Sequence, residues 1–248
     1  MTSPKIVLIT GASQGIGRAC ADAFLAAGHH VILAARNQSG LDLVARQAPD
    51  RALAHACDVS DPDQVAALYA AIGSRFGRLD VVFNNAGISL PATEIADISW
   101  EDWRRVASVN LDGAFLIARG AFAMMRAQDP KGGRIINNGS ISAQVPRVGS
   151  VPYTTTKSAI TGLTRTLSLD GRKHDIACSQ IDIGNAASDM TDAMSKGVPQ
   201  ADGSLRPEPV MDVAHVADAV LHMASLPLEA NVQFMTLMAT KMPYIGRG

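Results

Sequence analysis

The pentapeptide Tyr153-Thr-Thr-Thr-Lys157 places a phenol and an ammonium group four residues apart. If the segment is helical, the two side chains lie on one face, one turn apart. A free tyrosine has a pKa of about 10 and is a poor base near neutral pH, but a nearby cation favours the phenolate and lowers that pKa. The pair predicts a tyrosine that exchanges a proton near neutral pH. In isolation, however, this spacing is more often a half-buried aromatic beside a solvated lysine.

A glycine-rich segment near the N-terminus, LITGASQGIGRA, supports the chemical interpretation. It places Gly11, Gly15 and Gly17 between a strand-like apolar run and a helical pattern. Glycines at such a junction allow a sharp turn, a close approach of the backbone to a pyrophosphate, and tight packing of the helix on the sheet. The N–H groups at the start of that helix attract an anion. Although a tight turn alone could explain the glycines, their context predicts a site for dinucleotide phosphates.

The elements that must position these residues follow from the alternation of apolar runs with helical patterns. This alternation predicts a Rossmann-type doubly wound α/β fold, with a seven-stranded parallel sheet and helices on both faces. A length of 248 residues fits one domain, 1–248. The polar segment 186–210 is too long for an ordinary connection and predicts a lid over a substrate. The expected strands are 5–10, 30–35, 51–57, 79–85, 134–140, 176–182 and 232–238, and the expected helices are 15–27, 39–48, 61–77, 99–128, 152–170 and one after 212.

Composition excludes several classes of function. Hydrophobic residues make up 47% of the chain, charged residues 18%, and the formal net charge is −1, so we expect a globular protein without a basic field for nucleic acid or an anionic membrane. No apolar run reaches the roughly 18 residues of a membrane span, and the N-terminus does not resemble a signal peptide. Three scattered cysteines are typical of a reduced, cytoplasmic protein. The spacing of the six histidines predicts no metal site.

Taken together, the motifs resemble the classical short-chain dehydrogenase/reductase (SDR) family over nearly the whole chain. They occur in the family's order and at its spacings. The series is Thr10-Gly11-x-x-x-Gly15-Ile16-Gly17, Asp58-Val59, Asn84-Asn85-Ala86-Gly87, Asn110, Ser140 and Tyr153-x-x-x-Lys157.

The resemblance implies an enzyme that transfers a hydride between a nicotinamide and a carbonyl or secondary alcohol. Tyr153 would exchange the proton of the substrate oxygen, Ser140 would orient that oxygen, and Lys157 would also bind the nicotinamide ribose. Asn110 would bend its helix and hold a water that links Lys157 to solvent. The remaining implied cofactor contacts, with Tyr153 and Lys157, are Gly11, Ser13, Gln14, Gly15, Ile16, Gly17, Asp58, Val59, Asn85, Ala86, Gly87, Gly184, Ala186 and Ser188. One departure is Ile183, where the family commonly has proline before Gly184.

The end of the second expected strand bears on the choice of cofactor. NAD-binding members usually carry an acid there, which binds the adenosine ribose. This chain has the uncharged Ala35 followed by Arg36, whose guanidinium suits a 2′-phosphate. Gln14 stands where many NADP-binding members carry a second base. We therefore expect NADP(H), with NAD(H) as an alternative.

The substrate is less well indicated. The C-terminal segment LPLEANVQFMTLMAT resembles the 3-hydroxy acid (serine-type) dehydrogenase subgroup, which implies a small 3-hydroxy or 3-oxo acid. Its carboxylate would need a cation, and Arg147 is the first candidate, with Lys196 second. Two alternatives stay open: a 3-oxoacyl thioester on a carrier protein that docks on Arg104, Arg105 and Arg126, and a sensor that binds NADPH without turnover. By the same resemblance we expect a homo-oligomer, a tetramer or dimer, paired through helices 99–128 and 152–170.

Overall fold

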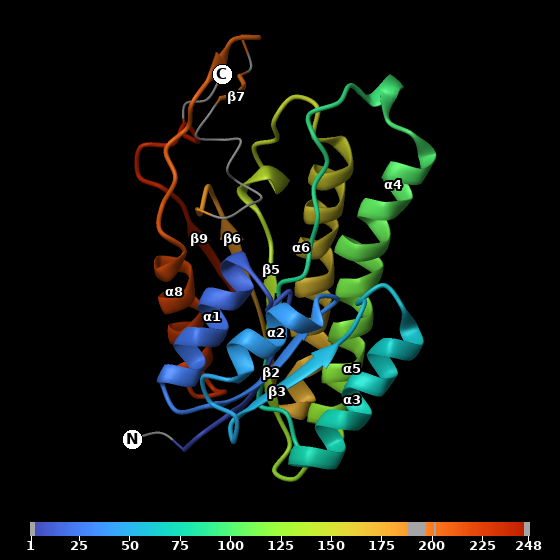
Figure 1. Ribbon diagram of the computed structural model, residues 1–248, viewed down its shortest axis with the longest axis vertical. Coiled ribbons are helices and arrows are strands. Elements are labelled where there is room, and N and C mark those ends of the chain that lie inside the picture. Colours follow the sequence, from blue (N-terminus) through green and yellow to red (C-terminus); the bar gives the residue numbers. More distant parts are fainter. Residues whose placement is uncertain (1–2, 188–196, 201, 246–248) are drawn as a thin grey trace.

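The computed structural model describes residues 3–187, 197–200 and 202–245, and its centre is a parallel sheet. Seven strands occur in the order β3-β2-β1-β4-β5-β6-β9, and every pairing between them is parallel (Figure 1). The predicted doubly wound sheet is therefore confirmed. The strands are β1 (Ile6–Thr10), β2 (His30–Ala35), β3 (Ala52–Ala56), β4 (Val81–Asn84), β5 (Gly133–Asn138), β6 (Ile176–Ile183) and β9 (Phe234–Leu237).

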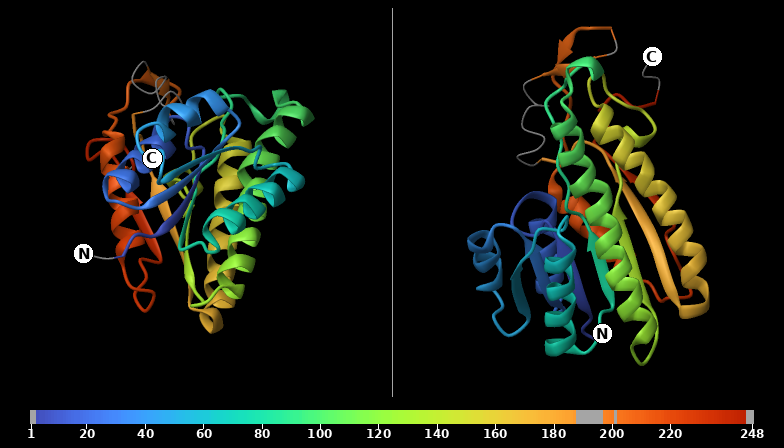
Figure 2. Two further views of the ribbon diagram at one scale, coloured as in Figure 1. Left: turned by 60° about the horizontal axis from the view of Figure 1, so that its bottom comes forward. Right: turned by 90° about the vertical axis from the view of Figure 1, so that its right-hand side faces the viewer.

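Helices cover both faces of this sheet, as the left panel of Figure 2 shows. On one face, α1 (Gly15–Ala26), α2 (Gln38–Ala45) and α8 (Val213–Ser225) contribute apolar side chains to one core cluster. On the other, α3 (Pro62–Phe76), α5 (Ala114–Ala127) and α6 (Val151–Gly171) pack on a second cluster. Central strands are buried on both faces, which explains why they are continuous apolar runs in the sequence.

Local signals explain where several helices begin. The side chain of Asp61 accepts hydrogen bonds from two N–H groups at the start of α3, and Pro62 occupies its first position. Ser99 and Asp212 cap α4 (Trp100–Ala107) and α8 in the same way. The helix expected over 99–128 is not uniform, because a π-helical segment, η2 (Ser108–Gly113), lies between α4 and α5. Asn110 lies in that segment.

The threonines of α6, which are poor helix formers, are held by specific contacts. Thr156 Oγ1 donates to the carbonyl oxygens of Pro152 and Tyr153 at 2.9 Å. Thr164 Oγ1 accepts a hydrogen bond from the Asn137 side chain on β5 and donates one to Gln180 Oε1 on β6. Packing against the sheet and these buried hydrogen bonds therefore outweigh the weak intrinsic propensity of the segment.

The region expected to form a lid, 186–210, lies partly outside the described residues. Ala186 forms an isolated bridge with Met211. A two-stranded antiparallel hairpin follows, with β7 (Val198–Pro199) paired to β8 (Leu205–Arg206). Ala239 and Met242 pack against Ile141, which lies in the 3₁₀ turn η3 (Ile141–Ala143) shortly after β5. This contact joins the C-terminal segment to the carboxyl end of β5.

The helical stretch Trp100–Ala127 is long and apolar enough to pass a length-and-composition test for a membrane span. It nevertheless carries Asp112 and Arg119, and Ile117 and Met125 on α5 are fully buried in the second core cluster. Core helices of folded domains pass the same test. The stretch is thus weak evidence for a membrane, because part of its apolar surface packs in the core.

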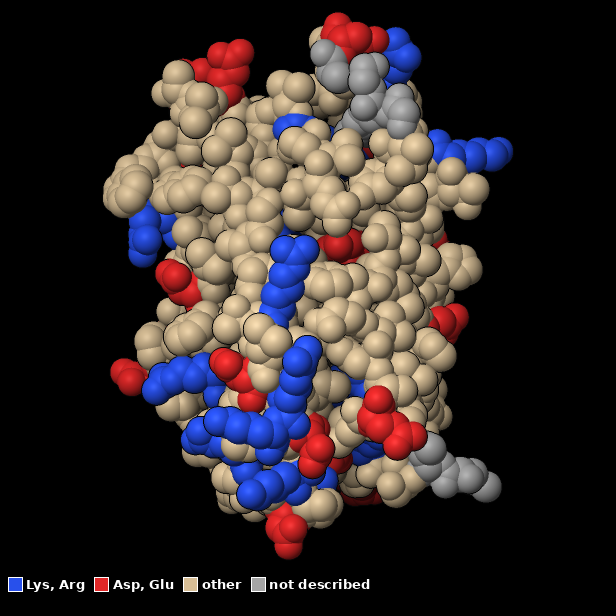
Figure 3. Space-filling view, turned by 180° about the vertical axis from the view of Figure 1, so that it is seen from behind, with Lys and Arg blue, Asp and Glu red and all other residues tan. Residues whose placement is uncertain are grey.

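The surface seen from behind carries charges of both signs at its lower end (Figure 3). Blue and red side chains are interspersed in this part of the face. The upper part of the same face has few charges. This face therefore presents no continuous basic field of the kind that binds nucleic acid.

Candidate active site

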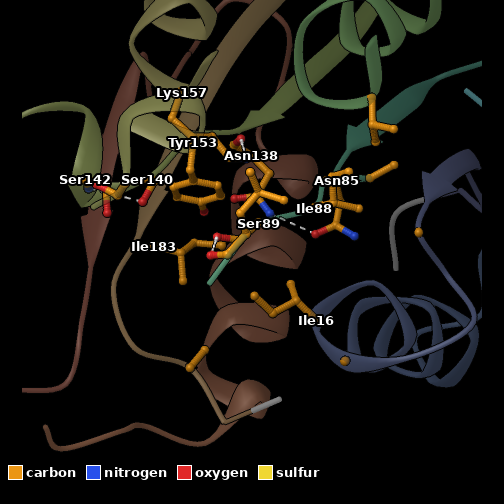
Figure 4. A pocket seen from close by; sticks show the side chains of 18 of the residues that line it. Ile16, Asn85, Ile88, Ser89, Asn138, Ser140, Ser142, Tyr153, Lys157 and Ile183 are labelled. Carbon is orange, nitrogen blue, oxygen red and sulfur yellow. Dashed lines mark hydrogen bonds between the residues drawn. The ribbon is translucent and has the colours of Figure 1, made fainter. Parts of the chain in front are cut away.

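A cavity of about 680 Å³ opens at the carboxyl ends of the strands. It begins at the turn after β1 and extends past β4 and β5 to the hairpin at Val198. The chain order reverses between β1 and β4, and ligands of doubly wound sheets bind at that switch point. Figure 4 shows Tyr153, Ser140 and Asn138 around one part of this cavity and Ile16 and Asn85 around another.

The turn after β1 has the geometry of a phosphate cradle. Gly11 and Gly15 have φ values of 68° and 54°, in the region that favours glycine. A Cβ on Gly17 would lie 2.2 Å from the carbonyl oxygen of Gly11, so no other residue fits there without moving the turn. Helix α1 begins at Gly15 with no side-chain cap and no acid in its first turn. Its first N–H groups are therefore suited to a ligand anion, and the residues present fit a dinucleotide.

A hydrogen-bonded layer ties this cradle to the neighbouring strands. Thr10 Oγ1 accepts from the backbone N–H groups of Asn85 and Ala86 at 2.9 Å. The Asn85 side chain donates to the carbonyl oxygen of Thr10 and accepts from Asn138. Asn138, which the sequence analysis did not identify, thus links the phosphate end of the cavity to its catalytic end.

The predicted catalytic residues come together at the end of β5 and the start of α6. The hydroxyl of Ser140 accepts from the N–H of Ser142 at 3.1 Å, and it lies close enough to Tyr153 to lower the pKa of that phenol. Lys157 Nζ lies 5.7 Å from the centroid of the Tyr153 ring and donates to the carbonyl oxygen of Asn138 at 2.7 Å. All three side chains line the same cavity (Figure 4).

The electrostatics differ from the expectation that Lys157 lowers the pKa of Tyr153. Burial instead raises the pKa of Tyr153, and the Ser140 hydrogen bond and the charge of Arg147 oppose this rise only in part. Burial also lowers the pKa of Lys157 to about 8, against the influence of the Asp182 carboxylate. The expectation was wrong because it omitted the cost of removing both groups from water. Tyr153 is consequently a neutral phenol near pH 7 and holds the proton that carbonyl reduction requires.

Asn110 occupies the π-helical segment and has its side chain turned to the loop after β4. Its Oδ1 accepts from the N–H of Ile88 at 2.8 Å, and its Nδ2 donates to the Ile88 carbonyl oxygen at 2.9 Å and to Thr156 Oγ1 at 3.3 Å. A Cβ on Gly87 would lie 3.3 Å from Asn110 Oδ1 and 3.8 Å from Lys157 Nζ. Asn110 therefore fixes the cavity wall next to Lys157. Its water-mediated role stays a prediction.

Asp182, near the end of β6, is a buried acid that the sequence analysis missed. Its Oδ1 accepts from the backbone N–H of Ser140 at 3.0 Å and from the side chain of Gln180 at 2.7 Å. Burial raises the pKa of Asp182, while these two hydrogen bonds and the charge of Lys157 oppose the rise. The carboxylate thus holds Ser140 in place and supports the charge of Lys157. A charged residue at the carboxyl end of a buried parallel strand was the available signal.

Replacing Asp182 by Asn keeps an oxygen for the Ser140 N–H and removes the charge. Because the carboxylate raises the pKa of Lys157, its loss lets Lys157 release a proton at lower pH. We expect the alkaline limb of kcat/KM for carbonyl reduction to move to lower pH by roughly one unit. Asp182→Ala, which also loses the acceptor, should lower kcat at every pH. Superimposable pH profiles for wild type and Asp182→Asn would contradict this role.

At the adenosine end, Arg36 follows β2, is exposed, and lines the cavity. It takes part in no ion pair with any described residue. Asn37 caps α2 by accepting from the N–H of Gly40 at 3.2 Å. Asp58 accepts from the backbone and hydroxyl of Ser60 and also lines the cavity. The other predicted cofactor residues here, Ser13, Gln14, Ile16, Val59, Ala86 and Gly87, line it as well.

The loop after β6 begins at Ile183, where the family commonly has proline. Ile183 is the last residue of β6 and pairs in register with Leu237, and the N–H of the following Gly184 donates to the Leu237 carbonyl oxygen at 2.8 Å. A Cβ on Gly184 would lie 2.5 Å from the Cβ of Met238, so packing requires glycine there. Gly184 and Ala186 line the cavity. Two further predicted residues, Ser188 and Lys196, lie outside the described residues.

The cations expected to recognise the substrate already have partners. Arg147 lines the cavity, but its Nη2 lies 2.5 Å from Glu208 Oε2 and 2.8 Å from Asn185 Oδ1. Arg104 pairs with Asp112 at 3.9 Å, and Arg105 with Asp102 at 2.7 Å. Glu208 lies in a polar segment without periodicity, and nothing in the sequence indicated that it would pair with Arg147.

A cavity of dinucleotide size, a glycine cradle, and a Ser–Tyr–Lys group beside it define a nicotinamide-dependent oxidoreductase that acts on CH–OH groups. Comparison with known proteins agrees. The family described as short chain dehydrogenase matches residues 5–199. The chain therefore belongs to the short-chain dehydrogenase/reductase family.

Individual relatives span most of the chain. A 3beta-hydroxysteroid dehydrogenase of Mediterraneibacter gnavus is 33% identical over 197 residues, covering 78% of this chain and 70% of the relative. Momilactone A synthase of Oryza sativa subsp. japonica is 33% identical over 230 residues, covering 89% and 83%. The closed form of a serine dehydrogenase complexed with NADP+ superposes with a TM-score of 0.87 at 25% identity and covers 98% of each chain.

Proposed function

We propose that this enzyme is an NADP(H)-dependent oxidoreductase of carbonyl compounds and secondary alcohols, with Asn110, Ser140, Tyr153 and Lys157 as its catalytic residues. The observation that carries the proposal is that Ser140, Tyr153 and Lys157 converge on one cavity that also contains the glycine cradle. A merely structural tyrosine would not need a buried serine and a buried lysine at one open cavity.

When bound, the nicotinamide supplies the hydride at C4 or accepts it there. In reduction, the hydroxyl of Tyr153 gives its proton to the carbonyl oxygen of the substrate, and in oxidation it takes the alcohol proton. Ser140, fixed by the Ser142 and Asp182 contacts, orients the same oxygen. The Lys157 ammonium, held by the Asn138 carbonyl, offers its remaining donors to the nicotinamide ribose and stabilises negative charge on Tyr153 as the proton leaves.

The direct test is loss of NADPH absorbance with a panel of ketones and β-keto compounds. Turnover of at least one of them, with product alcohol formed in equal amount, supports the proposal. Binding of NADPH without turnover of any compound would favour the alternative of a sensor. The intact catalytic group argues against a sensor, since such a protein has no need of the Ser140–Tyr153 pair.

The preference for NADP(H) rests on Arg36 and the lack of an acid at the end of β2. With Arg36→Ala, the KM for NADPH should rise by about tenfold, whereas the KM for NADH should change little, because only the 2′-phosphate loses a partner. Steady-state kinetics with both cofactors measure this. Equal use of NADPH and NADH by the wild type, unchanged in the variant, would contradict the proposed preference.

Two substrate classes compete with neutral carbonyl compounds. A 3-hydroxy or 3-oxo acid is favoured by the likeness to serine dehydrogenase, but Arg147 already pairs with Glu208. A 3-oxoacyl carrier protein would need Arg104, Arg105 and Arg126 to bind it, and two of these arginines already pair with carboxylates. The matched hydroxysteroid dehydrogenase is named for an uncharged secondary alcohol. These observations favour an uncharged substrate.

We further propose a cytoplasmic homo-oligomer, a tetramer or dimer, built as one domain over residues 1–248 with 186–210 as its lid. Support for association comes from exposed apolar side chains on the long helices. Trp100 on α4 is 73% exposed, Phe115 on α5 50% and Leu169 on α6 58%. Large exposed apolar side chains are common at association surfaces.

A further inference from the structure

The substrate end of the cavity contains a buried ion pair between Arg147 and Glu208. The side chain of Arg147 is 15% exposed and that of Glu208 is 1% exposed. Burial alone would raise the pKa of Glu208, but hydrogen bonds from Asn185 and Arg147, together with the Arg147 charge, bring it below its ordinary value. Glu208 is therefore ionised near neutral pH, and the pair is close to electrically neutral.

Further hydrogen bonds hold this pair rigidly. Glu208 Oε2 also accepts from Asn185 Nδ2 at 2.9 Å, and Oε1 accepts from Gln200 Nε2 at 3.2 Å. On the other side, Ser150 Oγ donates to the carbonyl oxygen of Arg147 at 2.6 Å. The arginine is thus fixed from the loop before α6, and the glutamate from the loop after β6 and from the hairpin region. Moving Arg147 toward a different anion would break several of these contacts.

Arg147 nevertheless keeps hydrogen-bonding capacity. Both of its hydrogen bonds leave from Nη2. Its Nε is buried and out of reach of a ligand, whereas Nη1 makes no hydrogen bond to a described residue and is not among the buried atoms without a partner. A guanidinium with paired charge and an unused Nη1 donor suits an uncharged acceptor such as a carbonyl or hydroxyl oxygen.

The rest of the substrate end is mainly apolar. Leu90, Pro91, Ile141, Val148, Ile183 and Val198 line the cavity there. A carboxylate that enters such a site loses its hydration and needs a net positive charge in return. Beside Arg147 it would instead face the Glu208 carboxylate across the guanidinium, which is unfavourable.

Granted the proposed oxidoreductase function, we infer that this site selects uncharged carbonyl compounds and secondary alcohols with an apolar body and rejects their carboxylate counterparts. Glu208 is the specificity-determining residue, because it cancels the charge of Arg147. Arg147 supplies a hydrogen bond to an uncharged oxygen of the substrate.

The test compares binding of matched uncharged and anionic compounds to the enzyme–NADPH complex. Methyl 3-hydroxybutanoate and 3-hydroxybutanoate, and the same pairs with longer chains, are titrated while the fluorescence of bound NADPH is followed; these alcohols cannot be reduced by NADPH, so the signal reports binding alone. We expect the wild type to bind each ester about tenfold or more tightly than its acid. In Glu208→Gln, the ratio of ester to acid affinity should fall by about tenfold or more, since Arg147 is then uncompensated.

Asp202→Asn is the matched control, because it removes one exposed carboxylate from the same segment and should leave the ratio unchanged. The inference is overturned if the wild type binds the acids as tightly as the esters, or if Glu208→Gln leaves the ratio unchanged. Should Glu208→Gln fail to fold, the wild-type ratio decides alone. Titration detects binding without turnover, so a failure of the proposed reaction is recognised separately, by the lack of NADPH oxidation with every carbonyl compound.

Discussion

Tyr153→Phe should reduce kcat by roughly 10³-fold or more and leave NADPH affinity nearly unchanged. The ring keeps its place on α6, but the group that exchanges a proton with the substrate oxygen is gone, and general acid–base groups of this kind contribute about 10²- to 10⁴-fold. Steady-state kinetics with any reduced ketone, combined with a fluorescence titration of NADPH, separates the loss of chemistry from a loss of binding.

The chain offers a matched control in Tyr69. Its buried hydroxyl donates to the carbonyl oxygen of Ile117 at 2.5 Å, outside the cavity lining. Tyr69→Phe should therefore keep wild-type kcat and lower the free energy of unfolding by about 1 kcal/mol, the contribution of one hydrogen bond. Equal activity losses in the two variants would show that Tyr153 acts through stability and not through chemistry.

Gly17→Ala should weaken NADPH binding by about tenfold or more. The added Cβ would lie 2.2 Å from the Gly11 carbonyl oxygen and 2.7 Å from Asn85 Nδ2, so α1 and the turn before it must separate. Moving that turn displaces the N–H groups that face the pyrophosphate. Overpacking of this kind also lowers the free energy of unfolding by about 1–3 kcal/mol. Isothermal titration with NADPH and chemical denaturation measure the two effects.

Gly73→Ala on α3 provides the comparison. Its Cβ meets no atom within 4 Å, so the substitution should raise the free energy of unfolding by roughly 0.5–1 kcal/mol and leave NADPH affinity unchanged. If Gly17→Ala binds NADPH as tightly as Gly73→Ala does, the turn after β1 is not the phosphate site.

Much of this fold was predictable because its strands are buried on both faces and its helices carry clear start signals. The apolar run before Gly11 became β1, and Asp61-Pro62 began α3 as expected. The single helix expected over 99–128 was less accurate. Hydrophobic periodicity does not reveal a π-helical insertion such as η2, which turns Asn110 toward Ile88.

At the site, sequence motifs identified side chains that recur at fixed spacing, but not the contacts made between distant segments. Asp182 favours the charged form of Lys157, and Glu208 offsets the charge of Arg147, but each carboxylate meets its partner only after the chain has folded. The expected effect of Lys157 on Tyr153 was wrong for a related reason. Spacing along a helix indicates which groups are neighbours, whereas the degree of burial decides which protonation state they favour.

The central claim is that the cavity brings a nicotinamide and a carbonyl group together at Tyr153. The most direct measurement incubates the enzyme with NADPH deuterated at C4 and a reducible uncharged ketone, and follows the label in the alcohol by mass spectrometry. The account predicts that deuterium from one face of the nicotinamide appears at the carbinol carbon, and that Tyr153→Phe abolishes the transfer while NADPH still binds. Bound NADPH that never delivers its label to any carbonyl compound, or a Tyr153→Phe variant that transfers it at the wild-type rate, would contradict the account.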